Sequence, residues 1–169
     1  MLESKRLILH KPDLSFNAPL YDIHSNRKAT QYTPKRRHID ITETNKMLKD
    51  WINHWHKYGF GYFVIVEKNS SKVIGSGGAE KMTFAHKTYF NLYYRLHPQF
   101  TGQGYATEAI QTVIDWLVEL DTTMPFVIRT DKNNVPSINL ATRLGFYRDP
   151  NFDNFEDTND LFFFNNYLS

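Results

Sequence analysis

A glycine-containing segment between a strand pattern and a helix pattern constrains the fold of this chain more than any other part of it. The segment runs Gln-Phe-Thr-Gly-Gln-Gly-Tyr-Ala from Gln99 to Ala106. Because Gly102 and Gly104 have no Cβ, the backbone there can adopt positive φ and approach a ligand closely, with successive N–H groups pointing at it. At the start of a helix, whose macrodipole also attracts negative charge, such a turn is suited to hold a phosphate.

The residues on either side support this placement. Residues 90–96 are rich in β-favouring side chains and stop before Pro98, which predicts a strand. After the turn, apolar residues recur at helical spacing, which predicts an amphipathic helix with one buried face. These apolar residues are Ala106, Ala109, Ile110, Val113, Ile114, Leu117 and Leu120.

A Gly-x-Gly alone is equally compatible with a tight turn that binds nothing. A second segment is therefore needed to favour the ligand-binding interpretation. Residues 134–146 follow a short strand pattern at 126–130. They predict a short helix, with Pro136 in its first turn and Gly145 just past its end.

Together the two segments resemble motifs A and B of the GNAT superfamily of acyl-CoA-dependent N-acyltransferases. Gln99, Gly102 and Gly104 match the first motif, Gln/Arg-x-x-Gly-x-Gly/Ala. Asn134 and Ser137 match the second, Asn-x-x-Ser before a helix that ends in Leu-Gly-Phe, as found in the Rim-type ribosomal-protein N-terminal acetyltransferases. Weaker similarity before these motifs extends the resemblance over nearly the whole chain.

The order of predicted elements gives the fold class. We expect strands at about 6–10, 61–67, 72–84, 89–96, 126–130, 146–148 and 160–167, and further helices at about 13–26 and 42–58. Consecutive strands ahead of the motifs indicate an α+β fold with a mixed, mostly antiparallel central sheet of about six to seven strands and helices on both faces, as the resemblance also implies. The length of 169 residues suits a single domain, residues 1–169.

A dinucleotide-binding turn is the competing interpretation. It would want a third glycine where Thr107 stands and an acidic residue after the next strand, which Asp131 could supply. It would also require a repeating parallel βαβ pattern, which the consecutive strands do not give, so we disfavour it.

Composition excludes several classes of protein. The chain has no cysteine, which excludes disulfides, thiolate metal sites and a cysteine nucleophile, and we expect no metal. No signal peptide or membrane-length apolar run is present, which predicts a soluble, cytoplasmic protein without a membrane partner. A net charge of +2 does not argue for a nucleic-acid partner, and the basic run at 35–38 is expected to be a solvated loop.

The resemblance implies transfer of an acetyl group from acetyl-CoA directly to a primary amine. We expect the extended pantetheine arm to pair with the end of the central strand at Arg95, Leu96 and His97, with Asn134 as a side-chain partner. A backbone N–H near Leu96 would stabilise the developing oxyanion. The N–H groups expected to hold the pyrophosphate are those of Gly102, Gln103, Gly104, Tyr105 and Ala106.

Proton transfer is where this chain departs from the family pattern. By resemblance Ser137 lies near the sulfur, although it could equally form only local hydrogen bonds at the helix start. Asn91 stands where many members carry a glutamate, and an amide cannot act as a base. Either Glu80 on a neighbouring strand replaces it or water accepts the proton, and His86 is a further candidate that could be only a surface residue.

The acceptor is the least defined part of the sequence interpretation. It is expected to be a protein N-terminus or a small-molecule amine; a catalytically weak acyl-CoA-binding module is the alternative. Residues 149–160 contain five acidic residues and no lysine or arginine, so they could attract a cationic amine or be an ordinary solvated loop. The aromatic run at 161–164 could lie in the core or in a dimer seam, so monomer and homodimer both remain open.

Overall fold

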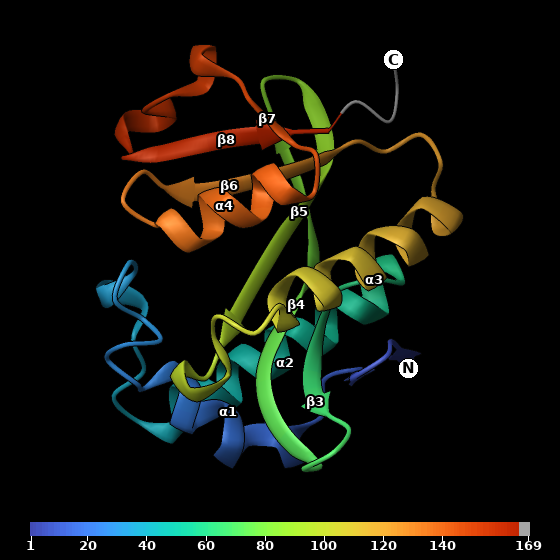
Figure 1. The fold of residues 1–169 in the computed structure, drawn as a ribbon, viewed down its shortest axis with the longest axis vertical. Coiled ribbons are helices and arrows are strands. Elements are labelled where there is room, and N and C mark those ends of the chain that lie inside the picture. Colours follow the sequence, from blue (N-terminus) through green and yellow to red (C-terminus); the bar gives the residue numbers. More distant parts are fainter. Residues whose placement is uncertain (166–169) are drawn as a thin grey trace.

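An eight-stranded sheet runs through the computed structural model, which describes residues 1–165 (Figure 1). The strand order is β1-β2-β3-β4-β5-β6-β8-β7, and six of the seven strand pairs are antiparallel, with β5–β6 parallel. The strands are β1 (Leu2–Glu3), β2 (Leu7–His10), β3 (Tyr62–Glu67), β4 (Lys72–Phe84), β5 (Lys87–Leu96), β6 (Phe126–Asp131), β7 (Tyr147–Arg148) and β8 (Asp160–Phe164).

The predicted α+β fold with a mostly antiparallel sheet is confirmed, and the strand count is higher than predicted by one or two. The strand that sequence patterning missed is β1, which has only two residues. Such a strand is too short to show the alternation by which strands are recognised. The prediction for the last strand reached Tyr167, but residues 166 and 167 lie outside the described part of the chain.

Four α-helices of the described residues, 1–165, cover the sheet. They are α1 (Asn17–His24), α2 (Ile41–Tyr58), α3 (Tyr105–Leu120) and α4 (Val135–Arg143). The helix predicted from Asp13 begins later, because Asp13 caps a single 3-10 turn by accepting from the Ser15 N–H at 2.8 Å. The start of α2 is fixed by a capping box, in which Asp40 accepts from the first turn and Glu43 accepts from the Asp40 N–H.

The helices lie on opposite faces of the sheet, as predicted. Leu92 on β5 belongs to one buried cluster with Ile110 on α3 and Leu140 on α4, so α3 and α4 share a face. On the other face, residues of α1 and α2 pack against Val64 of β3. Figure 1 shows α3 and α4 in front of the sheet and α2 behind it. Alternate residues of the central strands therefore point to different helices.

The aromatic run at the end of the chain lies in the chain's own core. Phe162, Phe163 and Phe164 on β8 are at most 7% exposed. Phe162 and Phe164 pack with Phe84 and, in part, with Phe152. Of the two locations that the sequence left open for these side chains, the structure therefore shows the core.

The two central strands diverge at one end, and this divergence positions the site. β5 pairs with β6 only from Phe90 to Leu92, opposite Phe126 to Ile128. Beyond Leu92 the pairing stops, and the two strands separate in opposite halves of the molecule (Figure 1). A sheet that opens in this way exposes backbone groups on the edge of β5.

Candidate functional site

A cleft of about 1300 Å³ lies where β5 and β6 diverge, and it is lined from both faces of the sheet. On the α3 and α4 face the lining includes the glycine turn and the start of α4. On the α1 and α2 face it includes Glu80, Asn91 and residues 28–36. Nine of the eleven expected site residues line this cleft: Glu80, Arg95, Leu96, Gly102, Gly104, Tyr105, Ala106, Asn134 and Ser137.

The glycine turn has the backbone geometry that the sequence suggested. Gly102 and Gly104 have φ of 73° and 81°, in the left-handed region, and Gly104 is the N-cap of α3. A glycine cap has no side chain to accept from the first-turn N–H groups, so these donors stay available. Gln103 does not line the cleft, and its side chain instead donates to the Gln99 carbonyl at 2.9 Å.

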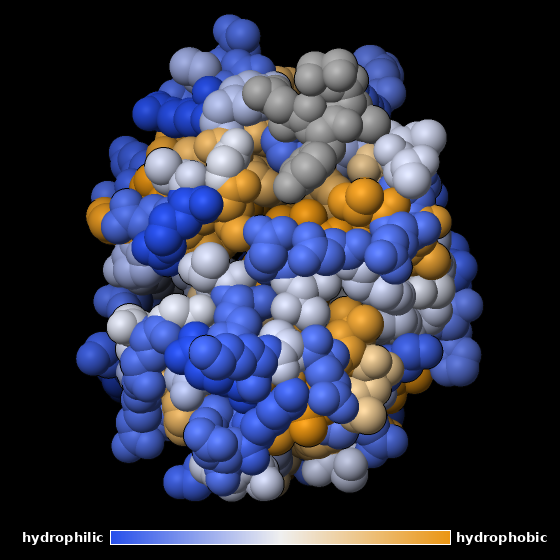
Figure 2. Space-filling model, turned by 45° about the vertical axis from the view of Figure 1, so that its right-hand side comes forward, coloured by the Kyte–Doolittle hydropathy of each residue, from blue (hydrophilic) through white to orange (hydrophobic). Residues whose placement is uncertain are grey.

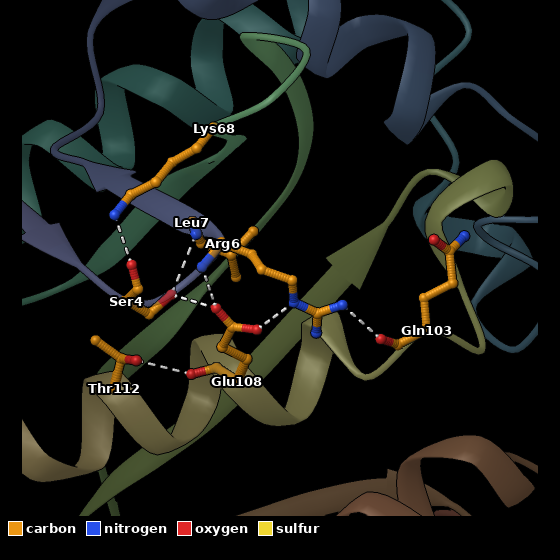
Figure 3. A network of polar contacts seen from close by, with 7 residues as sticks. All are labelled: Ser4, Arg6, Leu7, Lys68, Gln103, Glu108 and Thr112. Atoms are coloured by element: carbon orange, nitrogen blue, oxygen red, sulfur yellow. Dashed lines mark hydrogen bonds and ion pairs between the residues drawn. The ribbon is translucent and has the colours of Figure 1, made fainter.

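A partly buried ion pair between Arg6, near the N-terminus, and Glu108, on α3, supports this turn (Figure 3). The Arg6 Nε lies 2.6 Å from the Glu108 Oε2, and the Arg6 Nη1 donates to the Gln103 carbonyl at 2.9 Å. Glu108 Oε1 also accepts from the Ser4 hydroxyl at 2.6 Å and from the Arg6 N–H at 2.7 Å. The Arg6 guanidinium lies 4.1 Å from the centre of the Tyr105 ring. Arg6 therefore connects the first helical turn to the glycine turn.

The pKa of Glu108 reflects this environment. Burial raises the pKa of the carboxyl, but hydrogen bonds from Ser4 and Arg6 and the charge of Arg6 together lower it below its ordinary value. Glu108 is therefore ionised at neutral pH. Sequence reasoning assigned no role to Arg6 or Glu108, because they are 102 residues apart.

The open edge of β5 presents the backbone of Tyr94 and Leu96. The Phe90 N–H donates toward β6, to the Pro125 carbonyl at 2.8 Å, whereas the His97 N–H donates toward β4, to the Ile74 carbonyl at 2.7 Å. Because backbone direction alternates along a strand, the even-numbered residues face the gap. Leu96 is therefore placed to pair with an extended chain.

The other two residues expected at this edge point elsewhere. The backbone of Arg95 faces β4, by the same alternation, and its side chain donates to the Ala29 carbonyl on the opposite face from the glycine turn. His97 does not line the cleft, and its ring Nδ1 accepts from the Gln99 N–H at 3.2 Å.

Two candidate proton donors, the hydroxyl groups of Tyr94 on β5 and Ser137 on α4, come together at the start of α4. Asn134 Oδ1 accepts from the Ser137 N–H at 3.2 Å and so caps the helix, which leaves the Asn134 amide N–H groups for the cleft. Ser137 is 7% exposed. Burial raises the pKa of Tyr94, against smaller opposing effects of Arg143 and of polar contact with the Ser137 side chain. Tyr94 was missed because a tyrosine in a strand carries no functional pattern of its own.

Glu80 and Asn91 lie directly opposite each other on β4 and β5, on the α1 and α2 face. Burial raises the pKa of Glu80, while the charges of His54 and Arg36 and contact with Tyr62 lower it by less. The Asn91 Oδ1 is buried and has no hydrogen-bond partner among residues 1–165. A buried acceptor without a partner is costly unless a ligand or water satisfies it. His86 is exposed in the turn between β4 and β5 and does not line the cleft.

The acidic segment at 149–160 is partly neutralised by arginines from outside it. Arg129 lies 2.6 Å from Asp160 and 3.8 Å from Glu156, and Arg148 pairs with Asp153. The negative potential of this segment is therefore weaker than its five acidic residues, taken alone, indicate. The face shown in Figure 2 is mostly polar, with a band of apolar side chains across its upper half and smaller apolar patches below it.

Comparison with known proteins identifies the family. The model of the acetyltransferase (GNAT) domain matches residues 6–147. The chain belongs to the GNAT acetyltransferase family. GNAT enzymes use acetyl-CoA as the acetyl donor. Within residues 1–165 the sheet has one parallel pair, so it is not the repeating βαβ arrangement of the dinucleotide alternative.

Three similar proteins show how widely this GNAT chain resembles others. An uncharacterized N-acetyltransferase p20 from Bacillus licheniformis is 27% identical over 149 residues, which cover 88% of this chain and 83% of the relative. A Salmonella typhimurium acetyltransferase that modifies the N-terminal serine of ribosomal protein L7/L12 has a TM-score of 0.78, 22% identity and coverage of 95% and 94%. The microcin C7 self-immunity acetyltransferase MccE, solved with acetyl-CoA and AMP, has a TM-score of 0.75, 18% identity and coverage of 96% and 93%.

Neither a membrane-spanning helix nor a cluster of metal-ligating side chains is present in the described residues. No helix in residues 1–165 is long and apolar enough to cross a membrane. In the same residues, no group of three or more histidine, aspartate or glutamate side chains is arranged to hold a metal ion.

Proposed function

We propose that this GNAT acetyltransferase moves an acetyl group from acetyl-CoA directly to a primary amine, within a single domain formed by residues 1–169. The observation that carries the proposal is the cleft between β5 and β6. It connects the glycine turn on one face of the sheet with Glu80 and Asn91 on the other. A donor bound on the first face could thus react with an amine bound on the second.

The donor side fits coenzyme A. The glycine turn and the first turn of α3 offer backbone N–H groups and the positive end of a 16-residue helix to a pyrophosphate. Leu96 on the open edge of β5 would hold the pantetheine arm as an added strand, together with the Asn134 amide. The Leu96 N–H would also stabilise negative charge that develops on the thioester oxygen.

The acceptor side fits a neutral amine. The bound thioester supplies an activated acetyl carbon. Glu80, whose pKa is raised by burial, would accept the proton of the incoming ammonium, and the Asn91 Oδ1 would accept a remaining N–H and orient the nitrogen. As the new C–N bond forms and the C–S bond breaks, Tyr94 or Ser137 would donate a proton to the leaving thiolate. The second proton that the nitrogen loses as it becomes an amide would return to this donor hydroxyl through water. The raised pKa of Tyr94 keeps its hydroxyl protonated for this step.

The acceptor class is proposed as a protein N-terminus or a small-molecule amine. The Salmonella typhimurium neighbour modifies an N-terminal serine, which supports the first class, and MccE was solved with acetyl-CoA and the small molecule AMP, which supports a site for a small molecule in this fold. The loss of the usual strand glutamate at Asn91 favours one other candidate, an acyl-CoA-binding module with little turnover. Thiol release separates the two, since only the enzyme produces it.

The experiment is a thiol-release assay with acetyl-CoA and a panel of amines: peptides that begin with serine or alanine, and spermidine. Glu80→Gln should lower kcat by roughly 10²-fold or more and remove the acidic limb of the pH profile, because the carboxylate is the active form. Glu119→Gln is the matched control, since Glu119 is exposed on α3.

A rescue experiment tests the cross-strand pairing. Because Glu80 and Asn91 are opposite one another, adding Asn91→Glu to Glu80→Gln returns a carboxylate to the same face of the sheet. Part of the lost rate should return. Unchanged rates in Glu80→Gln would remove Glu80 from the mechanism, and no thiol release with any amine would favour the binding module.

A further inference from the structure

Arg95 makes three hydrogen bonds, two of which join the end of β5 to the connection between α1 and α2. Its Nη1 donates to the Ala29 carbonyl at 2.7 Å, its Nη2 to the Thr33 hydroxyl at 2.9 Å, and its Nε to the Tyr93 hydroxyl at 3.2 Å. Ala29 and Thr33 are 66 and 62 residues away in the sequence. The planar fork of a guanidinium can satisfy such divergent acceptors at once, which an ammonium cannot.

We call the hydrogen bonds from Arg95 to Ala29 and Thr33 the tether, and the surroundings of Arg95 favour these bonds over an ion pair. Among residues 1–165, no carboxylate lies within salt-bridge distance of Arg95. Two histidines lie close enough to feel the charge of Arg95, His24 and His38, and their rings stack with centres 5.0 Å apart. Burial first, and then the charge of Arg95, lowers the pKa of His24 to about 3, and both also lower the pKa of His38. These histidines are neutral, so the guanidinium is not repelled from this position.

The tethered connection is a wall of the cleft. It contributes Lys28, Gln31, Tyr32 and Arg36 to the lining, on the same face of the sheet as Glu80. The positive charge of Arg36 acts to lower the pKa of both Glu80 and Tyr62. Any shift of this wall therefore changes the space and the charge in front of Glu80.

We propose that Arg95 is a positioning residue for the amine acceptor: it fixes residues 28–36 as the acceptor wall. This inference rests on the proposed function. It replaces the sequence expectation that Arg95 binds the cofactor, because the Arg95 side chain lies on the α1 and α2 face. We expect residues of the glycine turn, which lie on the other face, to keep their contacts when the hydrogen bonds of Arg95 to residues 28–36 are removed.

The test compares Arg95→Lys and Thr33→Val with Lys35→Ala, a control on an exposed side chain of the same connection that does not line the cleft. Arg95→Lys keeps the charge and loses the fork, whereas Thr33→Val removes one acceptor. Hydrogen exchange would be followed at the amides of Thr30, Gln31 and Thr33, which all donate within this connection. Acetyl-CoA affinity is measured by calorimetry, and KM and kcat are measured with each amine of the panel above that turns over.

We expect Arg95→Lys to raise exchange at these amides and to raise the acceptor KM about tenfold, with less change in kcat. Thr33→Val should have a smaller effect in the same direction, and acetyl-CoA affinity should stay within about twofold in both. Unchanged exchange, an unchanged KM or a loss of acetyl-CoA affinity in Arg95→Lys would overturn the proposal. If no amine turns over in wild type, the proposed function fails, while the exchange and affinity results still judge the tether.

Discussion

Glu108→Gln gives a prediction whose size follows from the contacts of one side chain. The carboxylate accepts three hydrogen bonds at 2.6 to 2.7 Å, from the Ser4 hydroxyl, the Arg6 N–H and the Arg6 Nε. A glutamine has one oxygen, so its NH₂ group must face a donor in either orientation. At least one bond is lost, and the acceptor of the remaining bonds is no longer charged.

The expected cost is moderate. A hydrogen bond to a charged group contributes about 1.5 to 3 kcal/mol, and partial exposure of the Arg6–Glu108 pair reduces its contribution, so we expect a loss of about 2 kcal/mol in the free energy of unfolding at pH 7. For a chain of this size, that loss lowers Tm by about 4 to 8 °C. Because Arg6 also holds the Gln103 carbonyl, acetyl-CoA affinity should fall about fivefold.

The pH dependence of the free energy of unfolding tests whether the charge of the Glu108 carboxylate causes this loss. The folded pKa of Glu108 is lowered, so its stabilising contribution is present above the ordinary glutamate pKa of about 4.3 and is lost as pH falls through the lower folded value. The difference in stability between wild type and Glu108→Gln should therefore shrink below about pH 4. Urea unfolding at pH 7 and at acidic pH measures this, with Glu119→Gln as the control on the same helix. Equal stability of Glu108→Gln and wild type at pH 7 would refute the reasoning.

Three further predictions follow from single contacts. Gly75→Ala should destabilise the protein by about 3 kcal/mol or more, because its Cβ would lie 2.2 Å from the Arg95 carbonyl; a variant as stable as wild type in urea contradicts this close approach. His24 stays neutral in the folded state down to about pH 3. The free energy of unfolding should therefore fall by about 2 kcal/mol from pH 6.5 to 5, as His24 of the unfolded chain takes up a proton. His24→Phe should remove this part of the fall, and an equal fall in the variant would exclude His24 as its cause. Tyr94→Phe and Ser137→Ala should each lower kcat of thiol release about tenfold without weakening acetyl-CoA binding; normal rates in both would exclude them as proton donors.

Local patterns in the sequence were enough to predict most elements of the fold. The bounds predicted for β4, residues 72–84, are those observed, because its length and its flanking turns are both local signals. The glycine turn was found for the same reason. In contrast, the start of α1 was predicted too early, since an Asp cap reads the same before a 3-10 turn as before an α-helix.

The supporting contacts of the site could not be predicted from local patterns. The alternation of side chains along β5 was predictable, but only the packing of α1 and α3 on opposite faces shows that Arg95 and Leu96 serve different halves of the cleft. The Arg6–Glu108 pair joins residues 102 positions apart. Likewise, the cation that neutralises Asp160 is Arg129, which comes from another strand.

Calorimetric titration with acetyl-CoA, beside free CoA and NAD, measures whether the glycine turn forms a coenzyme A site. We expect wild type to bind acetyl-CoA and CoA but not NAD. We also expect Gly104→Asp to lose most of this affinity, because the substitution places a carboxylate at the proposed pyrophosphate site and a side chain at a φ of 81°. Absence of CoA binding in wild type, or an unchanged affinity in Gly104→Asp, would contradict the proposed coenzyme A site.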